Sequence, residues 1–160
     1  MSGQENRRGV MLLLFALAFG LAVSGGTGAR AAAPAPPPGS LYARLGGGPV
    51  VERLTSLLID QLVADPQLNQ SFKGTNLKRV KAMLAEQICA LAGGGCTYSG
   101  DSMREVHAGH HISEREFYGL VELLRADMRR LGIRVRERNQ LLALLAPMKS
   151  DVVDVTVPAP

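Results

Sequence analysis

Hydrophobic residues spaced three and four positions apart run through most of the chain after residue 48. One such stripe follows Pro49 and comprises Val50, Leu54, Leu57, Leu58 and Leu62. A second begins after Asn76, a predicted N-cap, ends at three consecutive glycines (93–95), and comprises Leu77, Val80, Leu84, Ile88 and Leu91. No strand-type alternation of any length competes with these stripes before the last residues. The pattern therefore predicts an all-α domain with about four main helices.

The remaining helices are shorter or follow later in the chain. Ser40 caps a one-turn segment at 41–45, and Asp65-Pro66 starts a short turn that ends near Phe72. Two further helices precede and follow Gly132, and the last one is expected to bend at Pro147. Their apolar positions are Leu120, Val121, Leu124 and Met128 in the first, and Leu141, Leu142, Leu144 and Leu145 in the second.

The segment Met103–Phe117 carries the clearest chemical signal. His107 ends a very short predicted helix, which Gly109 is placed to terminate in the left-handed conformation. Ser113 and Glu116 form a capping box that starts the next helix almost at once. An imidazole displayed in this way is either a metal ligand or an incidental surface residue.

A zinc or copper site is one interpretation of this segment. His107, His110 and His111 have the i, i+3, i+4 spacing of ligands on one helical face. However, Gly109 interrupts the helix that would align them, and no fourth ligand is near in sequence. The alternative for His110 and His111 is a pair of exposed loop histidines.

The first forty residues differ in character from the rest. Arg7 and Arg8 precede an apolar run of 14 residues from Val10 to Val23, and small residues with A-x-A cleavage patterns follow. The run is shorter than the roughly 20 residues that span a bilayer, although an uncleaved signal could act as an anchor. We predict a signal peptide or anchor at 1–31, a Pro/Ala-rich linker at 32–39, a domain at 40–153 and a flexible tail at 154–160. The protein is expected to be exported, either periplasmic or anchored to the outer face of the inner membrane, with membrane contact only through the N-terminal segment.

Removing that segment changes the charge balance. Three arginines and one glutamate leave with residues 1–31, so the formal net charge falls from +4 to +2. We therefore expect no nucleic-acid partner. One basic cluster remains and is interpreted as a solvated face; it comprises Arg125, Arg129, Arg130, Arg134, Arg136 and Arg138.

The two cysteines, Cys89 and Cys96, leave two alternatives. A disulfide would persist in an exported protein, but two buried thiols fit the sequence equally well. Neither belongs to a C-x-x-C-H motif, so thioether attachment of haem is not supported.

Ordered motifs over about 115 residues resemble a known family. They are LYARLGG at 41–47, VADPQL at 63–68 followed by Phe72, GTNL at 74–77, LAGG at 91–94, YSG at 98–100, MREVH at 103–107 before Ile112 and Phe117, and LAPMKSDVV at 145–153. In order and spacing the chain resembles the group I truncated haemoglobins, the small two-over-two helical globins. The resemblance implies non-covalently bound haem b with its iron.

The resemblance also implies roles for individual residues. His107 would be the proximal iron ligand through Nε2. The haem slot would be lined by Phe72, Leu77, Val80, Leu84, Tyr98, Met103, Val106 and Phe117. Lys78, Arg79 and Lys81 are candidate propionate partners, although a solvated basic turn explains them as well.

The distal side departs from the family's polar pattern. Ile59 stands where oxygen-retaining relatives often have tyrosine, and Leu84 where they often have glutamine. A hydrogen bond lost to bound oxygen costs about 1 to 3 kcal/mol, so we expect weak, fast-releasing oxygen binding. Gln87, one turn beyond Leu84, could replace the donor, although a solvent-facing amide is the favoured interpretation. Met83 is a candidate sixth ligand that would favour electron transfer.

Three functions follow from these features. The first is a binding protein for diatomic gases (O2, CO and NO), and the second is an electron carrier with Met83 on the iron and an unidentified electron donor. The third is an NO-detoxifying haem enzyme. The apolar distal residues make an enzyme less favoured than a binding protein.

Overall fold

The computed structural model of the chain describes residues 35–154. The predicted signal or anchor at 1–31, the start of the linker and the tail after residue 154 lie outside the described residues. No described helix is both long enough and apolar enough to cross a membrane.

The described residues form helices and no strands, which confirms the all-α prediction. The longer helices are α2 (Gly47–Ala64), α3 (Leu77–Leu91), α5 (Glu114–Arg130) and α6 (Val135–Leu145). The short elements are α1 (Leu41–Leu45), a 3₁₀ turn η1 (Asn69–Phe72), α4 (Met103–His107), a 3₁₀ turn η2 (Ala146–Met148) and α7 (Lys149–Val152).

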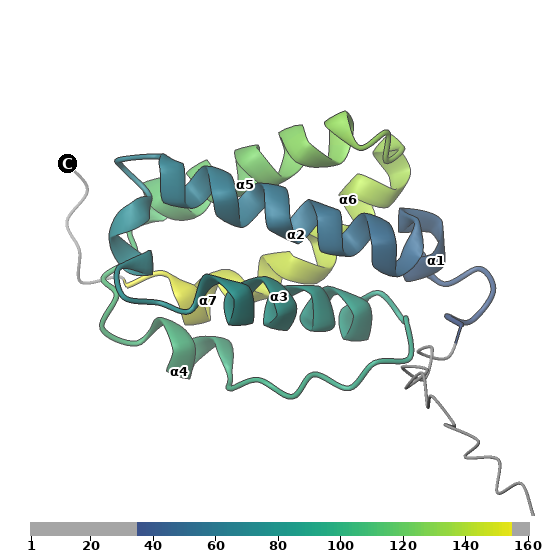
Figure 1. Cartoon of the computed structure of the whole chain (residues 1–160), viewed down its shortest axis with the longest axis horizontal. Helices are drawn as coiled ribbons and strands as arrows, with labels where there is room; N and C mark the ends of the chain where they lie inside the picture. Colours follow the sequence, from purple (N-terminus) through teal and green to yellow (C-terminus); the bar gives the residue numbers. More distant parts are fainter. Residues whose placement is uncertain (1–34, 155–160) are drawn as a thin grey trace, which may run out of the picture. The chain divides into compact units, whose positions relative to one another are not determined.

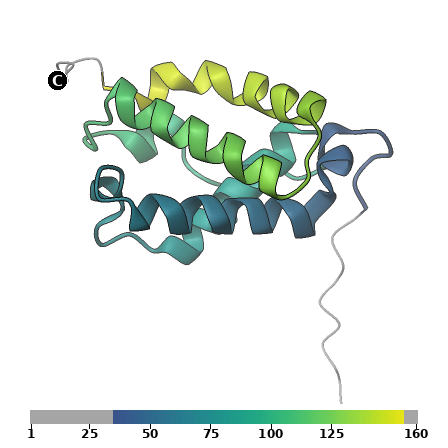
Figure 2. The same ribbon diagram turned by 90° about the horizontal axis from the view of Figure 1, so that it is seen from above.

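Helix α2 is the centre of the packing. It contacts both α3 and α5, while α1 contacts α2 and α6 (Figure 1). After α5 the chain turns at Gly132, whose φ is 73°, and α6 runs back toward the other end of the domain (Figure 2). The short helix α4 contacts α7, so the C-terminal segment lies beside the segment that carries His107.

The start of α2 differs from the sequence prediction. We expected Pro49 to open the helix, but it begins at Gly47, and Pro49 lies in the first turn, where its missing N–H costs nothing. Val51, rather than Val50, is fully buried at 1% exposure. Val50 is half-buried because its side chain lies against Gly46, at a position where an added Cβ would collide with it.

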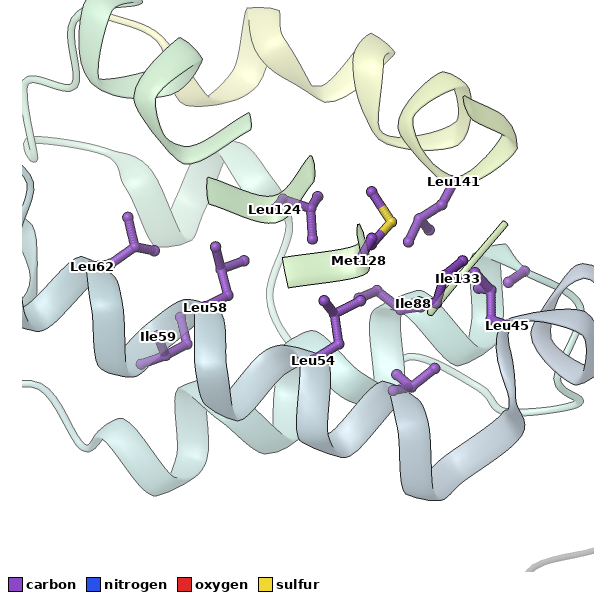
Figure 3. Close-up of a cluster of buried hydrophobic side chains, with 12 residues drawn as sticks. Leu45, Leu54, Leu58, Ile59, Leu62, Ile88, Leu124, Met128, Ile133 and Leu141 are labelled. Carbon is purple, nitrogen blue, oxygen red and sulfur yellow. The ribbon is translucent and has the colours of Figure 1, made fainter. Parts of the chain in front are cut away.

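A hydrophobic core lies between α2, α3, α5 and α6. Its labelled residues in Figure 3 include Leu54, Leu58, Ile88, Met128 and Leu141, all at most 2% exposed. Burial of apolar surface on this scale is the main stabilising contribution to such a domain.

Two carboxylates are buried at the edge of this core. Asp127 accepts a hydrogen bond from Gln61 Nε2 at 2.5 Å, which links α5 to α2. Glu137 lies 3.0 Å from Arg134 and 3.4 Å from Arg44, which links α6 to α1. Each carboxylate therefore has a polar partner inside the fold.

Cys89 and Cys96 form a disulfide, so the alternative of two free thiols is wrong. Their Cα atoms are 5.7 Å apart, within the range that a disulfide spans. A Cβ at Gly94 would collide with both Cys89 Sγ and the Tyr42 ring, which explains a glycine in this turn. The bridge closes the loop that follows α3.

Candidate functional site

An apolar cavity of about 450 Å³ lies between α2, α3, α4 and the start of α5. This volume is in the range of small-molecule and cofactor sites. The predicted site residues that line it are Ile59, Phe72, Val80, Met83, Leu84, Gln87, Tyr98, Met103, Val106, His107 and Phe117. Leu77 does not line it and packs against the hydrophobic core instead.

His107 enters this cavity from the last residue of α4. Its Nδ1 lies 2.7 Å from the carbonyl oxygen of Met103, one turn earlier. Because a carbonyl only accepts hydrogen bonds, Nδ1 carries the proton and Nε2 keeps its lone pair. That nitrogen is the one an imidazole needs to coordinate a metal.

The environment favours the neutral form of this imidazole. Burial lowers the pKa of His107, the bond to the Met103 carbonyl partly opposes this, and the nearby charge of His110 lowers the pKa further. A neutral imidazole is the form that binds iron.

Polar contacts fix the five-residue helix α4. Ser102 Oγ accepts a hydrogen bond from the Glu105 amide at 3.3 Å, and Glu105 Oε2 accepts one from the Ser102 amide at 3.0 Å. Arg104 also pairs with Asp151 of α7. A helix this short is unstable alone, so these contacts set the orientation of His107.

The chain after α4 turns as the sequence predicts. Gly109 has a φ of 76°, and the capping box of Ser113 and Glu116 starts α5. His111 has a φ of 52°, and its Nδ1 lies 2.9 Å from Asp154 Oδ2. This pair holds the turn against the C-terminal segment.

The zinc or copper interpretation of this turn finds no support. Among residues 35–154 no group of three His, Cys, Asp or Glu side chains is arranged to hold a metal ion. His110 is exposed and lines the cavity, whereas His111 pairs with Asp154. The one imidazole that is half-buried and points to the cavity is His107.

The α3 side of the cavity presents apolar residues and one buried amide. Gln87 is only 8% exposed, so the favoured interpretation of a solvent-facing amide is wrong. Its Nε2 donates to Met148 Sδ at 3.5 Å, and a thioether is a weak acceptor. Met83 and Leu84 line the cavity one turn earlier.

Tyr98 lies in the loop that follows α3 and lines the cavity. Its hydroxyl donates to the Asp101 carbonyl at 3.1 Å, and its ring lies where a Cβ at Gly100 would be. Burial raises the pKa of Tyr98, and the charges of Asp101 and Glu86 raise it further. Glu86 in α3 anchors this loop by accepting bonds from the Ser99 amide and hydroxyl at 2.9 and 2.8 Å.

The three basic residues at the start of α3 lie in different environments. Arg79 lines the cavity, Lys78 does not, and Lys81 is paired with Asp60 at 2.6 Å. Arg79 is therefore the one of the three that is placed to meet an anionic group in the cavity.

Several lining residues were not predicted from the sequence. They are apolar residues next to predicted ones: Leu58, Leu62, Leu68, Ile112, Leu120 and Val152. Leu58 and Leu62 flank Ile59 on the same face of α2, and Leu120 follows Phe117 by one turn. Helical spacing could have found Leu58, Leu62 and Leu120, whereas Leu68, Ile112 and Val152 do not share a helix with a predicted residue and gave no such signal.

The fold and the cavity together define a small helical protein that presents a half-buried imidazole, His107, to a largely apolar site. Solved structures with this architecture are two-over-two haemoglobins. A truncated haemoglobin from Tetrahymena pyriformis superposes with a TM-score of 0.68 at 24% identity, covering 71% of this chain and 97% of that one. The 2/2 haemoglobin from Synechococcus sp. PCC 7002, solved with covalently attached haem, gives 0.67 at 22% identity, with coverage of 71% and 98%. These likenesses confirm the two-over-two fold.

Sequence relatives agree with the structural ones. The chain is 33% identical over 116 residues to the group 1 truncated haemoglobin GlbN of Mycolicibacterium paratuberculosis, covering 72% of this chain and 85% of that protein. Residues 40–154 match the model of the bacterial-like globins. The chain therefore belongs to the bacterial-like globin family.

Proposed function

We propose that the protein binds haem b non-covalently in the 450 Å³ cavity and uses it to bind diatomic gases. Haem would supply an iron atom that takes one small gas molecule as a ligand. The observation that carries the proposal is the pairing of His107 Nδ1 with the Met103 carbonyl, which leaves Nε2 free at the cavity.

The cavity fits this group in three respects. Apolar side chains from α2, α3 and α5 form most of its wall, including Ile59, Val80 and Phe117, which suits a flat hydrophobic macrocycle. Arg79 offers a cation for a carboxylate of the group. Among the described residues no cysteine lines the cavity, and the two cysteines are joined to each other in the disulfide. Both observations support non-covalent binding.

The proposed ligand preference follows from the residues of α2 and α3 that line the cavity. Ile59 and Leu84 offer no hydrogen-bond donor, and the Gln87 amide is directed at Met148. Dioxygen gains more from a donor than the less polarised carbon monoxide or nitric oxide does. We therefore expect rapid oxygen release and weak discrimination against the other two gases.

Optical spectra test the cofactor and the ligand residue together. Purified protein should show a Soret band after haem addition, and His107→Ala should lose it. His110→Ala and His111→Ala serve as matched controls and should keep it. A protein that stays colourless with haem, or a His107→Ala variant with an unchanged spectrum, would contradict the proposal.

A second candidate is electron transfer with Met83 as a further iron ligand. The observation in its favour is that Met83 lines the cavity beside Leu84. Methionine more often fills space on a helix than binds a metal, so we rank it below gas binding. A low-spin ferrous spectrum that becomes high-spin in Met83→Leu would support it.

We further propose that the globin domain acts outside the cytoplasm. The support is the arginine pair and apolar run at residues 7–23 and the disulfide of Cys89 and Cys96, a bond that persists in oxidising compartments. Fractionation of cells that express the full chain should place it in the periplasmic or membrane fraction. Recovery in the cytoplasmic fraction would contradict export.

A further inference from the structure

Six arginines gather where α5 ends and α6 begins, and we call them the arginine corner. They are Arg125, Arg129, Arg130, Arg134, Arg136 and Arg138. All except the half-buried Arg138 are exposed. The acidic residues of the same segment, Asp127 and Glu137, are buried at 0% and 1% exposure. The charge that residues 125–138 present to solvent is therefore positive.

Some of these arginines form hydrogen bonds or ion pairs within the fold. Arg130 lies 3.5 Å from buried Asp127, Arg134 lies 3.0 Å from buried Glu137, and Arg138 donates to the Ile133 carbonyl at 2.7 Å. Arg125 lies 3.5 Å from Glu122, an exposed pair of little energetic value.

Arg129 and Arg136 differ from the other four arginines. Within residues 35–154 neither side chain forms a hydrogen bond or an ion pair. The helix dipole favours Arg129 in the last turn of α5, but it disfavours Arg136 in the first turn of α6. Stability of the fold therefore does not account for the positive charge at the start of α6.

The arginine corner lies at the end of the domain where the N-terminal linker enters. Arg44 donates to the Gly39 carbonyl and to Gln140 Oε1 of α6 at 2.7 Å, so the end of the linker is held against α6. In both views α1 and the turn between α5 and α6 share one end, and α4 lies toward the other (Figures 1 and 2). The α5–α6 turn is thus far from α4 (Figures 1 and 2), although Arg129 also lines a surface groove along α5 together with Glu122 and Glu116.

In place of the solvated face expected from the sequence, with membrane contact only through the N-terminal segment, we propose that the arginine corner binds the anionic phospholipid surface of a bilayer. Arginine guanidinium groups pair with phosphate in a bidentate way, and a basic surface is attracted to anionic lipid headgroups. The apolar run at 10–23 would give a second, hydrophobic attachment, and stable membrane binding generally takes two such signals. Eleven residues, 24–34, separate the apolar run from the described domain, and a fully extended chain of that length spans at most about 40 Å. This inference does not depend on haem.

Vesicle binding of residues 33–160 isolates the corner from the apolar run. This region forms one compact unit and contains the whole of the bacterial-like globin match, so we expect it to fold by itself. It should sediment with phosphatidylcholine vesicles containing phosphatidylglycerol, and not with phosphatidylcholine alone. Salt at 0.5 M should release it.

A double variant tests the residues. Arg129→Gln with Arg136→Gln removes two charges that form no hydrogen bond or ion pair within residues 35–154, and should lower the partition coefficient about thirtyfold. Lys73→Gln with Arg115→Gln is the matched control, because it removes equal charge from the first turn of α5 and from the residue that follows η1. Full-length protein in the same vesicles should show slower hydrogen exchange at 125–138 only when phosphatidylglycerol is present.

Three results would overturn the proposal. The first is equal binding to vesicles without anionic lipid, and the second is the same loss in the control double variant. The third is tighter binding to duplex DNA than to the anionic vesicles, which would assign the corner to nucleic acid instead.

Discussion

The two walls of the cavity are built by different forces. The wall that carries His107 is a five-residue helix held by a capping box and by the Arg104–Asp151 pair, all at or near the surface. The opposite wall comes from α2 and α3, where Ile59 is 3% exposed and the apolar faces merge with the core. Polar contacts orient one imidazole, whereas closely packed apolar residues such as Ile59 and Leu84 line the wall opposite it, and the Gln87 amide of that wall is bonded to Met148. Sensitivity to substitution should therefore differ between the two walls.

The largest effect is expected at His107 itself. His107→Gly should weaken haem binding by more than about a hundredfold, because even changes to residues behind a metal ligand cost ten- to a hundredfold. Haem titration followed at the Soret band measures it, and added imidazole should restore the band. Unchanged affinity would show that this wall does not hold the iron.

Removing the disulfide between Cys89 and Cys96 tests how much this bond stabilises the wall formed by α2 and α3. Cys89→Ser with Cys96→Ser should lower the free energy of unfolding by about 2 to 3 kcal/mol, since a short closed loop is released in the unfolded chain. Urea unfolding monitored by circular dichroism measures the free energy of unfolding. The native chain with its disulfide reduced by dithiothreitol provides the matched comparison. A loss below 0.5 kcal/mol would mean that packing alone holds the end of α3.

Restoring a donor to the apolar wall should change ligand kinetics. Ile59→Tyr is expected to slow oxygen dissociation about ten- to a hundredfold through a new hydrogen bond to the ligand. Ile59→Phe is the control, because it adds the ring without the hydroxyl. Stopped-flow displacement of oxygen by carbon monoxide measures both, and equal rates in the two variants would refute the apolar-pocket account.

The smallest effect is expected in the loop beside Tyr98. Hydrogen bonds from the Ser99 amide and hydroxyl lower the pKa of Glu86, so the contact is fully present above about pH 4.5 and is lost as pH falls through the lowered value. Hydrogen exchange at residues 97–102 should rise in that acid range. Glu86→Gln should show the faster exchange already at pH 7, whereas Glu122→Gln, at an exposed pair, should behave like the native chain.

The two walls also differ in how well sequence reasoning describes them. The conformation of the chain after His107 was predicted from nearby residues. Gly109 and the Ser113 cap lie within six residues of it, and the structure confirms both. The burial of Gln87 depends on Met148, which is 61 positions away, so no local pattern could show it. Leu77 shares a stripe with Val80 and both pack against the core, but only Val80 also lines the cavity. The disulfide likewise required a Cα distance that spacing does not give.

The spectrum of the ferrous, ligand-free protein tests the central claim most directly, since it reports both walls at once. With His107 on one side and no protein ligand opposite, we predict five-coordinate, high-spin iron that becomes six-coordinate on addition of carbon monoxide. A low-spin, six-coordinate spectrum before any gas is added would contradict the account, because a side chain such as Met83 would then occupy the site proposed for the gas.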